Sequence, residues 1–125
     1  MQVERIDFVA IPSRDRARAR AFYRDVLGLR QDEHRDLELW AGDTCLNIWE
    51  PEHFGEVFAP QTTAHLAFRV PDVTAARAEL ETKGVEFEGE TLDTGVCHMA
   101  FFRDPDGNAL MLHRRYASYG DGSNP

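Results

Sequence analysis

Hydrophobic positions in the first half of the chain switch between a strand period and a helix period. Residues 6–11, "IDFVAI", are short, apolar and rich in β-branched side chains, which predicts a strand. Ser13 or Asp15 can cap the helix that follows, in which apolar residues recur at helical spacing until Gly28. Two apolar runs, 37–40 and 44–50, flank the turn "AGD" and predict a hairpin. The first half therefore predicts β-α-β-β, with one more possible strand near residues 30–34.

The same order of elements returns in the second half. Residues 65–70 predict a strand, Asp72 a helix N-cap, and "VTAARAELETKG" a helix that Gly84 ends. The runs "VEFEGE", "VCHMAFF" and "NALMLHRR" predict three further strands, the last two joined by the turn "DPDG". The second half therefore predicts β-α-β-β-β.

The two halves can be aligned as an internal duplication. "FVAIPSRD" (8–15) aligns with "HLAFRVPD" (65–72), and "LNIW" (46–49) with "LMLH" (110–113). We therefore predict one pseudo-symmetric domain over residues 1–125. Its predicted parts are a first module (1–50), a linker or loop over the site (51–63), a second module (64–116) and a flexible polar tail (117–125).

Composition predicts a folded, cytoplasmic protein. Hydrophobic residues make up 42% of the 125 residues and charged residues 29%, which is ordinary for a globular domain. No apolar run approaches the roughly 20 residues that a bilayer requires, and the opening residues lack the order of a signal peptide. Cys45 and Cys97 form no CxxC pair and are interpreted as reduced thiols.

The net charge of −8 opposes binding to a phosphate backbone. Seven of the 14 basic residues, all arginines, precede residue 31, and Arg16, Arg20 and Arg24 share one helix face. Because Asp15 and Asp25 lie among them, we interpret this face as solvated. The sequence therefore predicts no nucleic-acid partner.

Three stretches carry a resemblance to a known family: "IDFVAIPSRDRARARAFYRDVLGL", "HLAFRVPDVTAARAELETKGVEF" and "MAFFRDPDGNALMLH". The chain resembles the vicinal oxygen chelate superfamily, which contains glyoxalase I, bleomycin-resistance proteins and extradiol dioxygenases. The resemblance implies an α+β fold in which two βαβββ modules form a cupped sheet with helices on the outer face. It also implies a homodimer, since family members of this size commonly form one.

The resemblance also implies where a metal would bind. Metal-dependent members take one ligand from the first and the last strand of each module, and the matching positions here carry Phe8, Asn47, His65 and Met111. Phe8 has no donor atom, and a thioether is too soft for zinc, iron(II), manganese or nickel. Catalytic zinc needs at least three protein ligands. We therefore predict no cofactor and no divalent metal centre, which argues against glyoxalase and dioxygenase activity.

Side chains alternate between the two faces of a strand, so the residues that face the cup can be derived. Pairing the last hairpin around a turn at 104–107 sets Ala100 opposite Met111 and His98 opposite His113. The predicted ligand-binding set combines apolar and polar side chains: Phe8, Trp40, Trp49 and Met111 with Glu38, Asn47, His65, His98 and His113. Such a hollow suits a small planar or aromatic molecule.

Other interpretations of this set stay open. The aromatic side chains could instead fill the space between the sheets or a dimer seam. A relocated metal site of His65, His98 and His113 would make the protein a metal-dependent lyase, isomerase or dioxygenase. A metal-free enzyme could use His65 or His113 as acid or base, and Cys45 on the same face could be an activated thiol. The leading hypothesis is a metal-independent binding protein.

Overall fold

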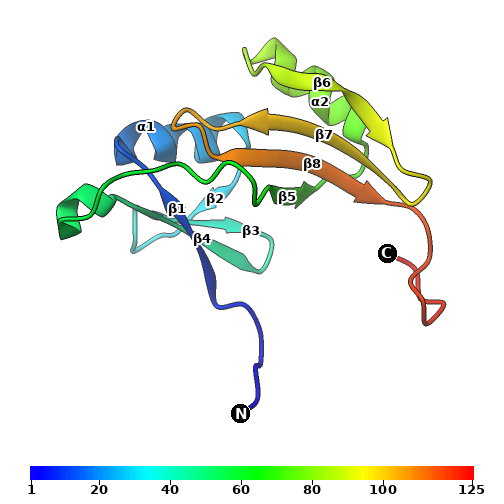
Figure 1. The fold of residues 1–125 in the computed structure, drawn as a ribbon, viewed down its shortest axis with the longest axis horizontal. Coiled ribbons are helices and arrows are strands. Elements are labelled where there is room, and N and C mark those ends of the chain that lie inside the picture. Colours follow the sequence, from blue (N-terminus) through cyan, green and yellow to red (C-terminus); the bar gives the residue numbers. More distant parts are fainter. The chain divides into compact units, whose positions relative to one another are not determined.

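The computed structural model describes residues 1–125 and divides into two compact units (Figure 1). The first unit contains residues 1–61 and 104–108, and the second contains residues 62–103 and 109–125. Most of the predicted linker therefore belongs to the first unit, where it includes a short 3-10 helix, η2 (Pro51–Phe54). The turn at 104–108 joins two strands of the second unit, yet it groups with the first.

The first unit is a βαβββ module. Its strands form one sheet in the order β1-β4-β3-β2, with β1 parallel to β4 and the other neighbours antiparallel. The elements are β1 (Phe8–Pro12), α1 (Arg16–Ala21), the π-helix η1 (Phe22–Val26), β2 (Arg30–Gln31), β3 (Glu38–Ala41) and β4 (Thr44–Trp49). The additional strand predicted near residues 30–34 is confirmed as β2.

Side-chain capping starts the first helix and a wide turn ends it. The Asp15 carboxylate accepts a hydrogen bond from the Arg18 N–H at 3.0 Å, which satisfies a free donor of the first turn. After Ala21 the helix widens, and the Leu27 N–H donates to the Phe22 carbonyl at 3.1 Å. The adjacent rings of Phe22 and Tyr23 are both buried and meet edge to face at 5.3 Å.

The first sheet has one covered face and one face without a helix. Leu39, Leu46 and Ile48 are 2% exposed or less and lie on the side of α1. Burying a side chain of this size contributes roughly 1.5–3 kcal/mol. The alternate positions of the same strands point to the opposite side, as the alternation of the sequence predicts.

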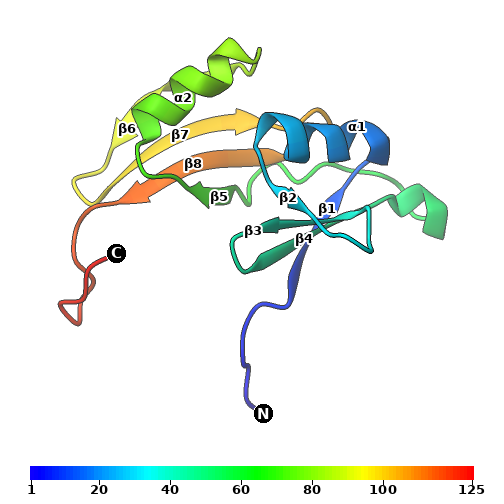
Figure 2. The same cartoon turned by 180° about the vertical axis from the view of Figure 1, so that it is seen from behind.

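The second unit repeats the module, with strand order β5-β8-β7-β6 and β5 parallel to β8. Its elements are β5 (Leu66–Arg69), α2 (Val73–Thr82), β6 (Phe87–Asp93), β7 (Cys97–Arg103) and β8 (Ala109–Arg115). The Asp72 carboxylate caps α2 by accepting from the Ala75 N–H at 3.0 Å. Helix α2 lies along β6, β7 and β8 (Figure 2), and covers Phe102, Leu110 and Leu112.

The predicted register of the last hairpin is wrong by one residue. Arg103 pairs with Ala109, so Met99 lies opposite His113 and Phe101 opposite Met111. The turn is one residue longer than predicted because Asn108 belongs to it: the Asp104 N–H donates to the Asn108 carbonyl at 3.1 Å. A shift of one residue exchanges the two faces of a strand. His98 therefore shares the helix-covered side with Ala100 and Phe102.

The C-terminal segment forms hydrogen-bonded turns around Arg115. Its Nε and Nη2 atoms donate to the carbonyls of Ala117 and Ser118 at 2.8 and 2.9 Å, and the guanidinium lies 4.4 Å from the centre of the Tyr119 ring. The flexibility expected of residues 117–125 stays a prediction. In neither unit does a helix have the length and apolar character that crossing a membrane would take.

Candidate functional site

The helix-free face of the first sheet, which we call the aromatic face, contains every site residue predicted in the first module. Its members are Phe8, Glu38, Trp40, Cys45, Asn47 and Trp49. Phe8 and Trp40 both lie beside Cys45, and Glu38 lies opposite Asn47. Phe8 is 56% exposed, and Trp40 and Trp49 are half-buried. The predicted orientation is confirmed, and the binding role of these residues stays a prediction.

Both tryptophans of the aromatic face have defined neighbours. The Trp40 Nε1–H donates to the Asp32 carboxylate at 3.2 Å, and the Arg30 guanidinium lies 5.7 Å from the ring. The Trp49 ring lies 6.0 Å from the ring of Phe54, which is 73% exposed. Sequence reasoning missed Asp32 and Phe54. For Phe54 the sequence did carry one signal, because residues 51–63 were interpreted as a loop over the site.

The environment of Cys45 opposes its use as a nucleophile. The side chain is buried, and burial raises the pKa of the thiol; the nearby carboxylates of Glu38, Asp32 and Asp7 raise it further. A raised pKa lowers the thiolate fraction at neutral pH. Cys45 is therefore a poor candidate for an activated thiol.

We expect Cys45 to react with iodoacetamide more slowly than free cysteine at pH 8. The rate should rise with pH over a higher range than that of the free amino acid, because only the thiolate reacts. Peptide mass spectrometry of timed alkylation reactions from pH 7 to 10 would measure this. A rate at pH 7 above that of free cysteine would contradict it.

The helix-free face of the second sheet carries sulfur and ring side chains. We call it the sulfur face; its members include His65, Ala67, Arg69, Cys97, Met99, Phe101, Met111 and His113. The His65 ring meets the Phe101 ring nearly edge to face at 5.1 Å. Met99 and Phe101 are residues that sequence reasoning missed, because the register error had assigned them to the other side.

His98 does not belong to the sulfur face. Its Nε2 lies 3.4 Å from the Asp93 carboxylate, and its ring lies 5.1 Å from the ring of Tyr116. The predicted pairing of His98 with His113 is wrong, since His98 pairs with Arg114. His98 is accordingly removed from the ligand-binding set.

The residues do not fit the divalent metal of the family. The first unit supplies Phe8 and Asn47 at the ligand positions, and the second supplies His65 and Met111. Neither unit holds a group of three or more His, Cys, Asp or Glu side chains able to bind a metal ion. The predicted three-histidine cluster does not form either. His98 lies on the other side of the sheet, and His65 and His113 are four register positions apart, roughly 13 Å along the strand direction.

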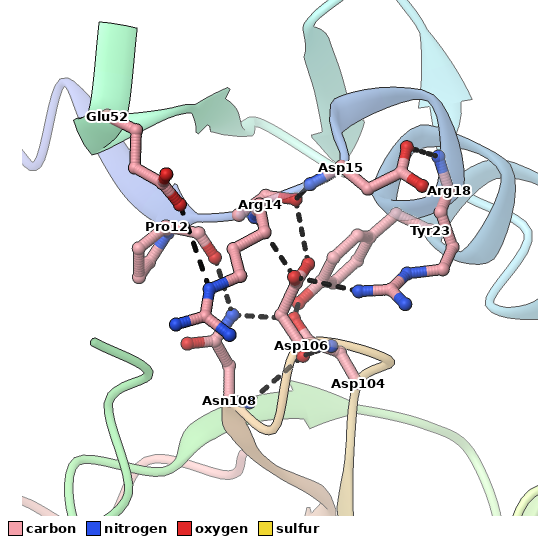
Figure 3. A network of polar contacts seen from close by, with 10 residues as sticks. Pro12, Arg14, Asp15, Arg18, Tyr23, Glu52, Asp104, Asp106 and Asn108 are labelled. Atoms are coloured by element: carbon pink, nitrogen blue, oxygen red, sulfur yellow. Dashed lines mark hydrogen bonds and ion pairs between the residues drawn. The ribbon is translucent and has the colours of Figure 1, made fainter. Parts of the chain in front are cut away.

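A buried polar network in the first unit, which sequence reasoning missed, centres on Asp104 (Figure 3). Its carboxylate accepts from the Tyr23 hydroxyl at 2.6 Å and from the Asn108 side chain at 2.8 Å. The other carboxylate oxygen accepts from the N–H groups of Asp106 and Asn108, both at 2.9 Å. Burial, followed by the charge and hydrogen bond of Asp104, raises the pKa of Tyr23 well above its usual range.

Asp106 connects the same turn to the start of α1. Its carboxylate accepts from the Ser13 hydroxyl at 2.7 Å and from the Arg14 N–H and the Arg18 guanidinium, both at 3.0 Å (Figure 3). The Asn108 amide also donates to the Pro12 carbonyl at 2.9 Å. The stretch "FFRDPDGN", which lies within the third stretch of the resemblance, thus fixes the junction between β1 and α1.

The arginines of α1 and η1 are paired with carboxylates. Arg16 lies 3.2 Å from Glu50 and Arg20 lies 3.0 Å from Asp36, while Arg24 lies 2.8 Å from Asp25. Such exposed pairs contribute little to stability. They do disperse the positive charge, as expected of a solvated helix face.

The class of protein follows from this architecture: an α+β protein built from two βαβββ units, each with one sheet face free of helices. The chain belongs to the Glyoxalase/Bleomycin resistance protein/Dioxygenase superfamily, whose family model matches residues 5–112. The implied family and fold are therefore confirmed.

The chain is similar to an uncharacterized protein, to part of an enzyme and to an antibiotic binding protein. The uncharacterized protein YaeR of Escherichia coli (strain K12) is 34% identical over 126 residues, covering 90% of this chain and 98% of that protein. A lactoylglutathione lyase of Pseudomonas aeruginosa is 46% identical over 48 residues, covering 38% of this chain and 27% of that protein. The structure of TnmS3, an antibiotic binding protein from Streptomyces sp. CB03234, has a TM-score of 0.73 at 25% identity and covers 92% of this chain and 98% of that one.

Proposed function

We propose that the protein binds a small planar or aromatic molecule without the divalent metal of its family. The observation that carries this proposal is the aromatic face, where two half-buried indoles and Phe8 surround the polar side chains of Asn47 and Glu38. Large rings supply apolar contact area, and a few polar groups orient a ligand. The fold shared with an antibiotic binding protein supports the same function.

In this proposal the aromatic face of the first unit supplies the contacts to the ligand. Trp40 and Trp49 stack on a flat ligand, and the Asn47 amide can both donate and accept hydrogen bonds. In the second unit, taken by itself, the binding role of His65, Met111 and His113 stays a prediction. We further propose a homodimer in the cytoplasm. The apolar side chains of Phe54 and Val57, which are 73% and 91% exposed, support the homodimer.

Tryptophan fluorescence tests this function directly. We expect members of a panel of planar aromatic compounds to quench the emission saturably in the presence of EDTA, because stacking changes the indole environment. Trp49→Phe and Trp40→Phe would identify the reporting ring. Asn47→Ala should weaken binding about twofold to tenfold, the worth of one hydrogen bond, whereas Ser118→Ala in the C-terminal segment serves as the unaffected control. A panel that gives no saturable change would contradict the proposal.

A second candidate, a metal-dependent lyase, isomerase or dioxygenase, is favoured by the local similarity to a lactoylglutathione lyase. With His98 excluded, His65 and His113 are the imidazoles left to it. Stoichiometric zinc, nickel, iron or manganese in purified protein, lost in His65→Gln, would establish this candidate and contradict metal-independent binding. Protein that is free of these metals and gains no thermal stability when they are added would exclude it.

A further inference from the structure

On the sulfur face, both internal methionines lie close to His113 in the strand register. The chain has three methionines, of which Met1 is the first residue. Met111 and His113 lie two residues apart on β8 and point to the same side, and Met99 lies directly opposite His113 on β7. We infer that Met99, Met111 and His113 form a site for a soft monovalent metal ion, Cu(I) or Ag(I).

The ligand types select such an ion. Thioethers are soft donors that favour Cu(I), and imidazole also binds copper, whereas zinc, manganese and magnesium prefer harder or charged ligands. Directly opposite residues have Cβ atoms about 4.5–5.5 Å apart, and diagonal neighbours about 7–8 Å. Methionine has three rotatable side-chain bonds, so Met99 and Met111 can both direct sulfur toward the imidazole.

The surroundings suit a monovalent ion. All three side chains are half-buried, and the ring of Phe101 lies opposite Met111. The His113 imidazole takes part in no hydrogen bond or ion pair, so its ring nitrogens are open. Arg69 lies opposite His113 on β5 and is exposed. Its positive charge repels a divalent ion about twice as strongly as a monovalent one.

The Cys97 thiol lies on the same face, two residues from Met99 on β7, and is buried. Cys97 is 6% exposed, and its Sγ lies 3.2 Å from the Thr94 hydroxyl. The proposed metal site lies within the second unit alone and is independent of the proposed function. A protein whose aromatic face binds no planar compound can still carry the metal site, and the reverse also holds.

Silver(I) is the probe, because it is soft, monovalent and stable in air. Silver nitrate is titrated in chloride-free buffer into full-length Cys45→Ala/Cys97→Ala protein labelled with 13C at the methionine methyl groups. We expect the methyl signals of Met99 and Met111 to shift saturably with one equivalent, while that of Met1 stays in place. Saturation at one equivalent with no shift of these two signals would overturn the inference, as would a titration without any shift.

Substitutions identify the ligands. Loss of a direct ligand should weaken silver binding at least about tenfold. Replacing a residue that only hydrogen-bonds to a metal ligand already lowers metal affinity by about that factor. Met99→Leu, Met111→Leu and His113→Gln should each show this loss in competition titrations, and the control His65→Gln should not. Anaerobic competition with bathocuproine disulfonate repeats the comparison for Cu(I). Equal affinity in all four variants, or a loss confined to His65→Gln, would overturn the site.

Discussion

Replacing Tyr23 by phenylalanine will lower the free energy of unfolding by about 2 kcal/mol, because it leaves a buried carboxylate without one of its donors. Tyr23 is fully buried, and its hydroxyl donates to Asp104 at 2.6 Å. Asp104 is 5% exposed, so water cannot readily replace the lost hydrogen bond. The ring itself is retained in the variant, so the loss reports on the hydroxyl.

Tyr116→Phe is the matched control. The Tyr116 hydroxyl also donates to a carboxylate, that of Asp93, at 2.7 Å. Tyr116 is 48% exposed, however, so water can replace the lost hydroxyl as a donor to Asp93. Urea denaturation followed by circular dichroism would compare the two variants at pH 7. Equal unfolding midpoints for Tyr23→Phe and the unsubstituted protein would contradict the role of the network.

Asn108→Ala will have a larger effect, a loss of about 3 kcal/mol, because several buried groups lose their partners at once. The Asn108 amide donates to Asp104 at 2.8 Å and to the Pro12 carbonyl at 2.9 Å, and its oxygen accepts from the Gln61 N–H at 3.0 Å. The side chain is 1% exposed. The substitution therefore removes hydrogen bonds to three segments at once: the turn at Asp104, the end of β1 at Pro12 and the loop at Gln61.

Asn47→Ala separates this structural asparagine from a binding one. Asn47 lies half-buried on the aromatic face, so its replacement should leave the unfolding midpoint within experimental error while weakening ligand binding. Denaturation and fluorescence titration of both variants would give opposite patterns. If Asn47→Ala unfolded as readily as Asn108→Ala, the assignment of Asn47 to binding would be wrong.

The first module was predictable because its signals are local. Side-chain alternation placed Leu46 and Ile48 beneath the helix and Asn47 and Trp49 on the other side, and the structure agrees. Capping chemistry likewise identified Asp72 and offered Asp15 beside Ser13 for the first helix; in the structure Asp15 and Asp72 each accept from a backbone N–H three residues ahead. These features depend on neighbours within a few residues.

The last hairpin was not predictable in the same way. Its register depends on whether Asn108 belongs to the turn or to β8, and partners far along the chain decide this. Tyr23, Pro12 and Gln61 hold Asp104 and Asn108 in place through contacts that no sequence pattern shows. One added turn residue moved His98 away from the sulfur face and brought Met99 there.

The sequence by itself determined the duplicated βαβββ architecture and the family, since hydrophobic period and capping reside in the residues themselves. It also determined that the residues at the four ligand positions do not suit a divalent metal, because donor chemistry is a property of each side chain: Phe8, Asn47, His65 and Met111. Only the tertiary structure decided which side chains share a face with His113. That choice depends on the strand register, which the turn of Asp104 and Asn108 sets through buried hydrogen bonds to Tyr23 and Pro12.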